Sequence, residues 1–148
     1  MVRYAVAWLA VGLALASPSL VKAQQQDTTR RGGQVELLQN YPNPFNPTTT
    51  IPFRLNADLF RNGHRPVVSL RIYNILAQLV AVPILQSSGQ PLNGIPLDCL
   101  DQSGGYCTYS AYWDGNYLNT GREAASGIYV YQLVVDGVRQ SKKMVVTK

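Results

Sequence analysis

Two cysteines, the only ones in the chain, are the residues best placed for chemistry. Cys99 and Cys107 are eight residues apart and flank the paired glycines Gly104 and Gly105. In an exported chain, an even number of cysteines at this spacing predicts a disulfide that closes a small loop. A redox or metal site is the alternative, but the chain has no Cys-x-x-Cys pattern, and its single histidine is 35 residues upstream.

That histidine, His64, lies in a polar turn beside Arg61, Asn62 and Arg65. A catalytic role would require a nucleophile and an orienting acid, and the sequence designates neither. We therefore expect a solvent-exposed loop histidine, no catalytic residue and no enzymatic activity. A small hydrolase is disfavoured for the same reason.

Three oxygen-bearing side chains follow Trp113, at spacings of two and three residues: Asp114, Asn116 and Asn119. A calcium loop would need more carboxylates and a bidentate acid. The alternative is an Asx-type turn in which Asp114 caps the bend while Trp113 packs into the core. We expect the turn, with no metal and no cofactor, although ion binding by residues 114–121 stays open.

Basic residues gather near the C-terminus at Lys142, Lys143 and Lys148. They are candidates for recognition by a partner, or they protect an edge strand against aggregation. The formal net charge of the chain is +5, and without residues 1–23, which contain Arg3 and Lys22, it is 11 basic minus 8 acidic groups, or +3. Basic residues never occur in runs longer than two. This charge is too small and too scattered to favour a nucleic acid partner, so we expect none.

The N-terminus has the pattern of a secretory signal peptide. Arg3 precedes an apolar run over residues 4–16, and residues 21–23 place small side chains at a cleavage site after Ala23. We expect residues 1–23 to be removed and residues 24–34 to form a flexible leader. A retained signal anchor, with membrane contact through residues 4–21, is the alternative.

Residues 35–148 read as one domain of short strands. Alternation of apolar and polar residues predicts strands over residues 49–55, 67–73, 106–113, 128–135 and 138–147, with others at 35–38 and 79–85. Pro52 predicts that its strand lies at a sheet edge. Asp136 and Gly137 predict a two-residue hairpin. We expect no helix after the signal peptide, and an all-β, antiparallel, immunoglobulin-like sandwich of about seven strands.

Residues 40–51 form a segment that we call the proline clamp. It contains three prolines, and each restricts its own backbone and that of the residue before it. We expect a stiff, extended entrance to the folded domain. Downstream, six tyrosines are expected to be mostly core or sheet surface, with a partner-binding patch as the alternative: Tyr106, Tyr109, Tyr112, Tyr117, Tyr129 and Tyr131.

Four pieces of sequence in order resemble one known family: NYPNPFNPTTTI, LRIYNILAQLV, YWDGN followed by ASGIYVYQLVVDG, and KKMVVTK at the end. The chain closely resembles the C-terminal sorting domain (type A) of type IX secretion substrates, and the related immunoglobulin-like module of flagellar hook-capping proteins. The resemblance covers residues 37–148. It implies a seven-stranded sandwich that is recognised at the outer membrane after export.

The resemblance also assigns motif residues. They are Tyr41, Pro42, Asn43, Pro44, Phe45, Asn46, Pro47, Trp113, Asp114, Gly115, Gly127 and Tyr129. The family has Gly where this chain has Ala77, so a positive-φ turn position is expected there.

We therefore expect an exported, non-enzymatic module that recognises proteins such as a secretion translocon, in the periplasm, at the outer membrane surface or outside the cell. The alternative is a structural subunit of an envelope complex, held at the periplasmic face of the inner membrane by its N-terminal helix. Only about ten leader residues precede the domain, so the usual cargo of a sorting domain is not evident.

Overall fold

The structure is a computed structural model that describes residues 33–118 and 120–148. The predicted signal peptide, most of the predicted leader and Asn119 lie outside the described residues. The first strand, β1, begins at Val35. In the described part of the chain, no helix combines the length and apolar character needed to cross a membrane.

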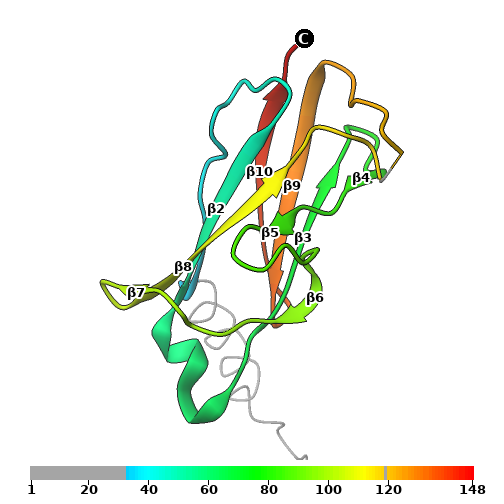
Figure 1. Ribbon diagram of the computed structural model, residues 1–148. Coiled ribbons are helices and arrows are strands. Elements are labelled where there is room, and N and C mark those ends of the chain that lie inside the picture. The colour runs from blue at the N-terminus through cyan, green and yellow to red at the C-terminus, as the bar shows by residue number, and fades with distance from the viewer. Residues whose placement is uncertain (1–32, 119) are drawn as a thin grey trace, which may run out of the picture.

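The strands form two antiparallel sheets (Figure 1). The first has the order β1 (Val35–Leu37), β2 (Thr49–Asn56), β8 (Tyr106–Trp113) and β5 (Ile84–Leu85), and β7 (Gln102–Ser103) also pairs with β8. The second has the order β10 (Val138–Val146), β9 (Gly127–Val135), β3 (Val67–Tyr73) and β4 (Leu79–Ala81), and β6 (Asn93–Pro96) also pairs with β3. The predicted all-β antiparallel sandwich is confirmed.

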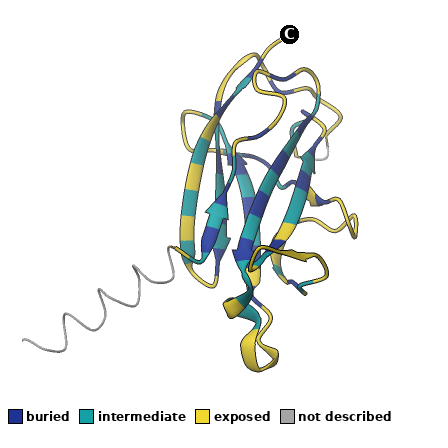
Figure 2. Cartoon of the chain, turned by 90° about the vertical axis from the view of Figure 1, so that its left-hand side faces the viewer, coloured by how far each residue is buried: buried dark blue, intermediate teal, exposed yellow. Residues whose placement is uncertain are grey.

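Alternating side chains from both sheets build one core. In β2, Ile51, Phe53 and Leu55 are buried while the residues between them are partly exposed. Leu70 and Ile72 of β3 are buried from the opposite sheet. Figure 2 shows this alternation as bands of colour along the strands. The period of two read from the sequence therefore identified the inward-facing residues correctly.

The strand β9 is central in its sheet, as its apolar residues on both faces predicted. It lies between β10 and β3, and it buries Tyr129, Tyr131 and Leu133. The hairpin to β10 turns at Asp136 and Gly137, whose φ angles are +47° and +83°. Positive φ at both central residues is what a type I′ turn requires, so the predicted hairpin is confirmed.

The expected edge position of the strand with Pro52 is wrong. The strand β2 lies between β1 and β8, so it is internal. Its proline is tolerated because β1 ends at Leu37, and next to Pro52 only the Leu38 N–H continues the pairing, donating to the Pro52 carbonyl at 3.0 Å. The missing N–H of Pro52 thus points to the side where the neighbouring strand has already ended.

The single strand expected over residues 79–85 is also wrong, because the chain changes sheets there. β4 pairs with β3 in one sheet, and β5 pairs with β8 in the other. Pro83 lies between them and has no N–H to donate to a ladder, which favours a break at this point. The irregular region beyond it holds the short strands β6 and β7, so residues 33–118 and 120–148 contain ten strand segments where about seven were expected.

A short helix replaces the predicted polar connection after β2. Ala57–Gly63 forms a 3₁₀ segment, and the Asn56 side chain accepts a hydrogen bond from the Asp58 N–H at 2.9 Å. Leu59 and Phe60 pack partly buried against the core. The segment was missed because it consists of two short helical pieces, interrupted by non-helical backbone at Arg61 and Asn62, and neither is long enough to show a helical repeat of apolar residues.

Candidate functional site

The motif residues from three distant parts of the sequence meet at one end of the sandwich. The Phe45 ring is buried and lies edge-on to the Trp113 ring, with centroids 5.3 Å apart. The Trp113 ring lies edge-on to the Tyr129 ring at 5.9 Å. These T-shaped pairs join the proline clamp to β8 and β9, and aromatic pairs of this geometry stabilise a core beyond their buried area.

The proline clamp is a bent segment whose backbone joins the edge of β10, so the expected extended geometry is wrong. The Phe45 N–H donates to the Val145 carbonyl at 3.0 Å, and the Thr147 N–H donates to the Phe45 carbonyl at 3.0 Å. Asn43 accepts from the Val145 N–H through its side chain at 2.9 Å. Figure 1 shows the clamp beside the end of β10. The clamp therefore covers the last part of the β10 edge.

Gly115 permits the closest approach between two motif stretches. A Cβ atom on Gly115 would lie 2.1 Å from the Pro47 carbonyl oxygen, and the φ angle of Gly115 is +81°. Both conditions require glycine. The adjoining Asp114 accepts from the Asn116 N–H at 2.9 Å, and the Trp113 indole N–H donates to the Asn116 carbonyl at 3.0 Å. The Asx-type turn that the sequence predicted is present, with Trp113 buried.

The remaining motif residues have different surroundings. Phe45 is the one buried side chain between residues 41 and 47, and the Tyr41 side chain is 57% exposed. Gly127 begins β9 with a φ of +151°. The exposed residues between Tyr41 and Pro47 form a surface. The clamp is held to β10 by backbone hydrogen bonds of Phe45 and by the Asn43 side chain.

Asn40 was not among the expected site residues, yet it organises the start of the clamp. It is buried, its N–H donates to the Tyr131 hydroxyl at 3.0 Å, and its amide donates to the Thr49 hydroxyl at 3.0 Å. The Tyr131 hydroxyl in turn donates to the Leu38 carbonyl at 2.8 Å. Burial raises the pKa of Tyr131, which keeps this hydroxyl protonated as a donor. Asn40 begins the first sequence piece of the family resemblance, but its bond to Tyr131 joins stretches 91 residues apart and leaves no local signal.

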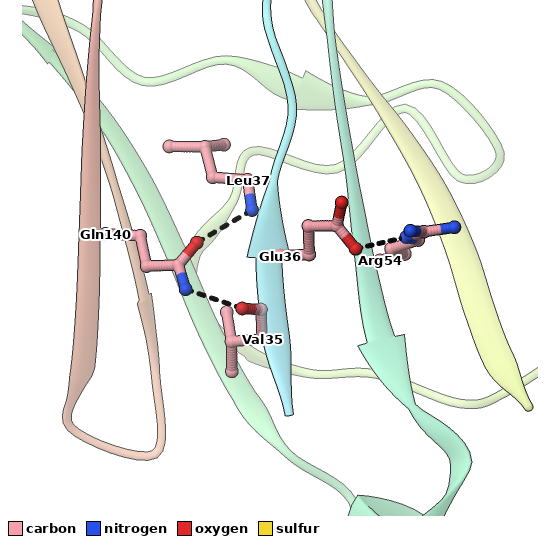
Figure 3. A network of polar contacts seen from close by, with 5 residues as sticks. All are labelled: Val35, Glu36, Leu37, Arg54 and Gln140. Carbon is pink, nitrogen blue, oxygen red and sulfur yellow. Dashed lines mark hydrogen bonds and ion pairs between the residues drawn. The ribbon is translucent and has the colours of Figure 1, made fainter. Parts of the chain in front are cut away.

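Gln140 was also missed, and it joins the two sheets where their edges meet (Figure 3). Its amide oxygen accepts from the Leu37 N–H at 2.8 Å, and its amide nitrogen donates to the Val35 carbonyl at 2.5 Å. β1 is thus paired on one side with β2 and on the other with a single side chain of β10. Beside it, Arg54 pairs with Glu36 on the first sheet.

The three candidate recognition lysines are not equivalent. The Lys148 ammonium lies 2.9 Å from the Glu123 carboxylate. Lys142 and Lys143 lie on β10 opposite Tyr131 and Val130 of β9. Within residues 33–148, Asn119 aside, neither Lys142 nor Lys143 has an ion pair.

The predicted disulfide is present. Cys99 and Cys107 are bonded, their Cα atoms are 5.4 Å apart, and the Cys107 side chain is buried. The bond ties the preceding loop to β8, and β7 lies inside the closed loop. A disulfide of this kind is consistent with an oxidising, exported compartment.

Near the disulfide, Tyr109 is held by the same loop. Its hydroxyl donates to the Asp98 carbonyl at 2.8 Å, and its ring stacks on Phe53 at 5.1 Å. Burial, with the nearby Asp98 carboxylate, raises the pKa of Tyr109 to about 12. Of the six tyrosines, Tyr129 and Tyr131 are buried and the other four are partly exposed, so the second half of the chain supplies both core and surface rings.

His64 is an exposed loop residue, and its side chain is 54% exposed. Its neighbour was not predicted from the sequence: the His64 Nε2 atom lies 2.7 Å from the Asp136 carboxylate, which also accepts a hydrogen bond from the Val67 N–H at 2.9 Å. Asp136 comes from the β9–β10 hairpin, 72 residues away. Among the described residues, no group of three or more His, Cys, Asp or Glu side chains could hold a metal ion.

Comparison with known proteins assigns the chain to no family. No protein-family model matches the sequence, and no curated protein matches it. Among solved structures, the chain is similar to one described as Pseudomonas fluorescens alkylpurine DNA glycosylase AlkC bound to DNA containing an abasic site analog. The identity is 15% and the TM-score is 0.47. The match covers 88% of this chain and 36% of that one, so this chain spans about a third of its length.

That match corrects one expectation. The sequence predicted that nucleic acid is not a partner, and the solved structure contains DNA. The exclusion of nucleic acid is therefore withdrawn. A likeness at this TM-score assigns no ligand to the present chain.

Proposed function

We propose that the chain is an exported, non-enzymatic β-sandwich module that acts through protein–protein recognition at the cell envelope or surface, as the resemblance to type IX sorting domains implies. The observation that carries the proposal is the meeting of the motif stretches at one end of the sandwich. The proline clamp, the turn at Gly115 and the end of β10 are held together by the Phe45–Trp113 contact and by backbone hydrogen bonds. A preformed surface of this kind costs little entropy when a partner binds.

The disulfide supports the exported part of this proposal. Cys99 lies in a loop and Cys107 in β8, and a structural disulfide of this kind is typical of an oxidising compartment. The finer location, at the outer membrane surface or in the medium, is part of the proposal.

The experiment locates the native protein and identifies what it contacts. Cells are fractionated, the chain is cross-linked and isolated from the envelope and from the medium, and its intact mass is measured. The proposal expects a chain that lacks residues 1–23, at the surface or in the medium, with a protein partner. A chain that stays in the cytoplasm, or that is recovered alone from every exported fraction, would overturn it.

If the isolated chain still contained residues 1–23 and co-purified with an inner-membrane complex, it would instead be a structural subunit. The sorting arm of the test uses substitutions, since deletion of residues 142–148 would remove the buried Met144 and Val146 and so unfold the domain. Lys142→Gln with Lys143→Gln keeps these core residues, and Arg61→Gln is the control on a distant exposed site. Sorting through the basic end predicts periplasmic accumulation of the double variant alone. Equal surface delivery of both variants would contradict it.

A further inference from the structure

The strand β10 has an edge that is covered along only part of its length. In an antiparallel ladder, alternate residues point their N–H and C=O groups away from the neighbouring strand. In β10 these are the odd-numbered residues, because Val145 and Thr147 pair with the proline clamp. The carbonyl of Lys143 accepts from the Gln39 side chain at 3.0 Å.

Below that point the edge is open. Within the part of the chain that the structure describes, no residue hydrogen-bonds to the backbone of Arg139 or Ser141, or to the N–H of Lys143. All three residues are exposed. The open edge, as we call the outward backbone groups of Arg139 and Ser141 together with the outward N–H of Lys143, therefore forms an unpaired row. It lies in line with the clamp, where one chain segment already pairs.

The open edge is also basic. Arg139, Lys142 and Lys143 lie within five residues, and none of them has an ion pair within the described ranges 33–118 and 120–148. Pairing with a second copy of β10 about Ser141 would place Arg139 opposite Lys143 of that copy. Like charges directly opposite each other destabilise a strand pair. The charge therefore opposes self-association and favours an acidic occupant.

We propose that the open edge of β10 is a strand-addition site for an extended, acidic segment of a partner protein. The inference rests on the proposed function and assigns it a surface and a partner chemistry. The added segment would exchange backbone hydrogen bonds with Arg139, Ser141 and Lys143, while its acidic side chains face the basic ones. The clamp above and Gln140, held against β1, keep the edge fixed.

The test uses the full chain and a synthetic nine-residue peptide of alternating glutamate and threonine or valine. Binding is followed by nuclear magnetic resonance and by amide hydrogen exchange. The proposal expects slower exchange at the Ser141 and Lys143 amides, and no change at Gln140 and Lys142, whose amides already pair with β9. A lysine peptide of the same pattern, and the acidic peptide with every backbone amide methylated, should not bind.

Two variants separate the contribution of backbone hydrogen bonds to peptide binding from the contribution of charge. Ser141→Pro removes an outward N–H and leaves the β9 ladder intact, so affinity should fall about fivefold relative to Ser141→Ala. Arg139→Glu with Lys143→Glu should weaken the acidic peptide about tenfold or more and create binding of the lysine peptide. Arg122→Glu, on a distant loop, is the charge control and should leave both unchanged.

Several results would overturn the proposal. They are equal binding of the methylated peptide, equal binding by Ser141→Pro and Ser141→Ala when both are folded, protection at amides other than the outward ones, or no binding of the acidic peptide at millimolar concentration. In the last case the lysines act only against aggregation. Failure here is separate from failure of the proposed function, since a native partner whose capture survives Ser141→Pro would leave that function standing at another surface.

Discussion

Replacement of Gly115 by alanine tests whether the proline clamp and the turn after β8 are locked together. Gly115 has a φ of +81°, and its Cβ would lie 2.1 Å from the Pro47 carbonyl oxygen. Gly105 is the matched control, because its φ is also +81° and nothing lies within 4 Å of its Cβ position. The difference between the two variants isolates the collision from the backbone strain.

The magnitude follows from what must move. In Gly105→Ala, left-handed backbone costs about 1–2 kcal/mol, offset by a few tenths to about 1 kcal/mol from the stiffer unfolded chain. In Gly115→Ala, Pro47 must also retreat by roughly 1 Å to restore an ordinary contact. That movement pulls on Phe45, its two backbone bonds to β10 and its buried ring. We expect an added loss of about 2–4 kcal/mol.

Urea unfolding followed by circular dichroism measures the stability of both variants. Hydrogen exchange of the Phe45 amide, which donates to Val145, reports on the clamp itself. We expect the Phe45 amide to exchange faster in Gly115→Ala and to be unchanged in Gly105→Ala. Equal stability losses in the two variants would refute the reasoning, because Pro47 could then move away from the new Cβ atom without any loss of stability.

Three further outcomes follow from other contacts. Gln140→Leu should cost about 1–3 kcal/mol in urea unfolding and expose the Leu37 amide to exchange, whereas unchanged Leu37 exchange would mean that the amide bridge is dispensable. Cys99→Ser should lower stability by roughly 2–3 kcal/mol under oxidising conditions and by nothing when the parent is reduced; a loss that persists against the reduced parent would contradict an effect of the cross-link. Stability should fall as pH rises from about 10 to about 12, because the unfolded chain releases the Tyr109 proton near pH 10 while the folded one holds it to about 12. Tyr109→Phe should flatten that fall in urea titrations across this range, and a parallel fall in the variant would assign it to other groups.

The strands and their inward faces were predictable because a period of two is a local property. Ile51, Phe53 and Leu55 needed only their own spacing to be assigned to the core, and the turn at Asp136 and Gly137 needed only two residues. The cysteine pair was predictable for a similar reason, since its partners are eight residues apart. Each of these features is encoded within one short stretch.

The features that were missed depend on contacts between distant stretches. Gln140 occupies an inward position of β10 and resembles a solvent-facing residue until β1 is placed beside it. Asn40 gains its role from Tyr131, 91 residues away. The expected edge position of Pro52 was wrong because β1 pairs with the strand that contains Pro52 and ends before it reaches this residue. A strand of three residues is too short for its end to be predicted from the sequence pattern.

The contacts that join β10 to β1 and to the proline clamp also restrict the order in which this chain can fold. These contacts join Val35 and Leu37 to Gln140, and Asn43 to Val145, across 102 to 105 residues. A growing or emerging chain cannot make any of them until the β9–β10 hairpin is available. Contacts so distant in sequence place folding in the slow, millisecond-to-second regime of β-sandwiches. The sandwich therefore cannot be completed until the β9–β10 hairpin has formed, whatever earlier strands have paired before it.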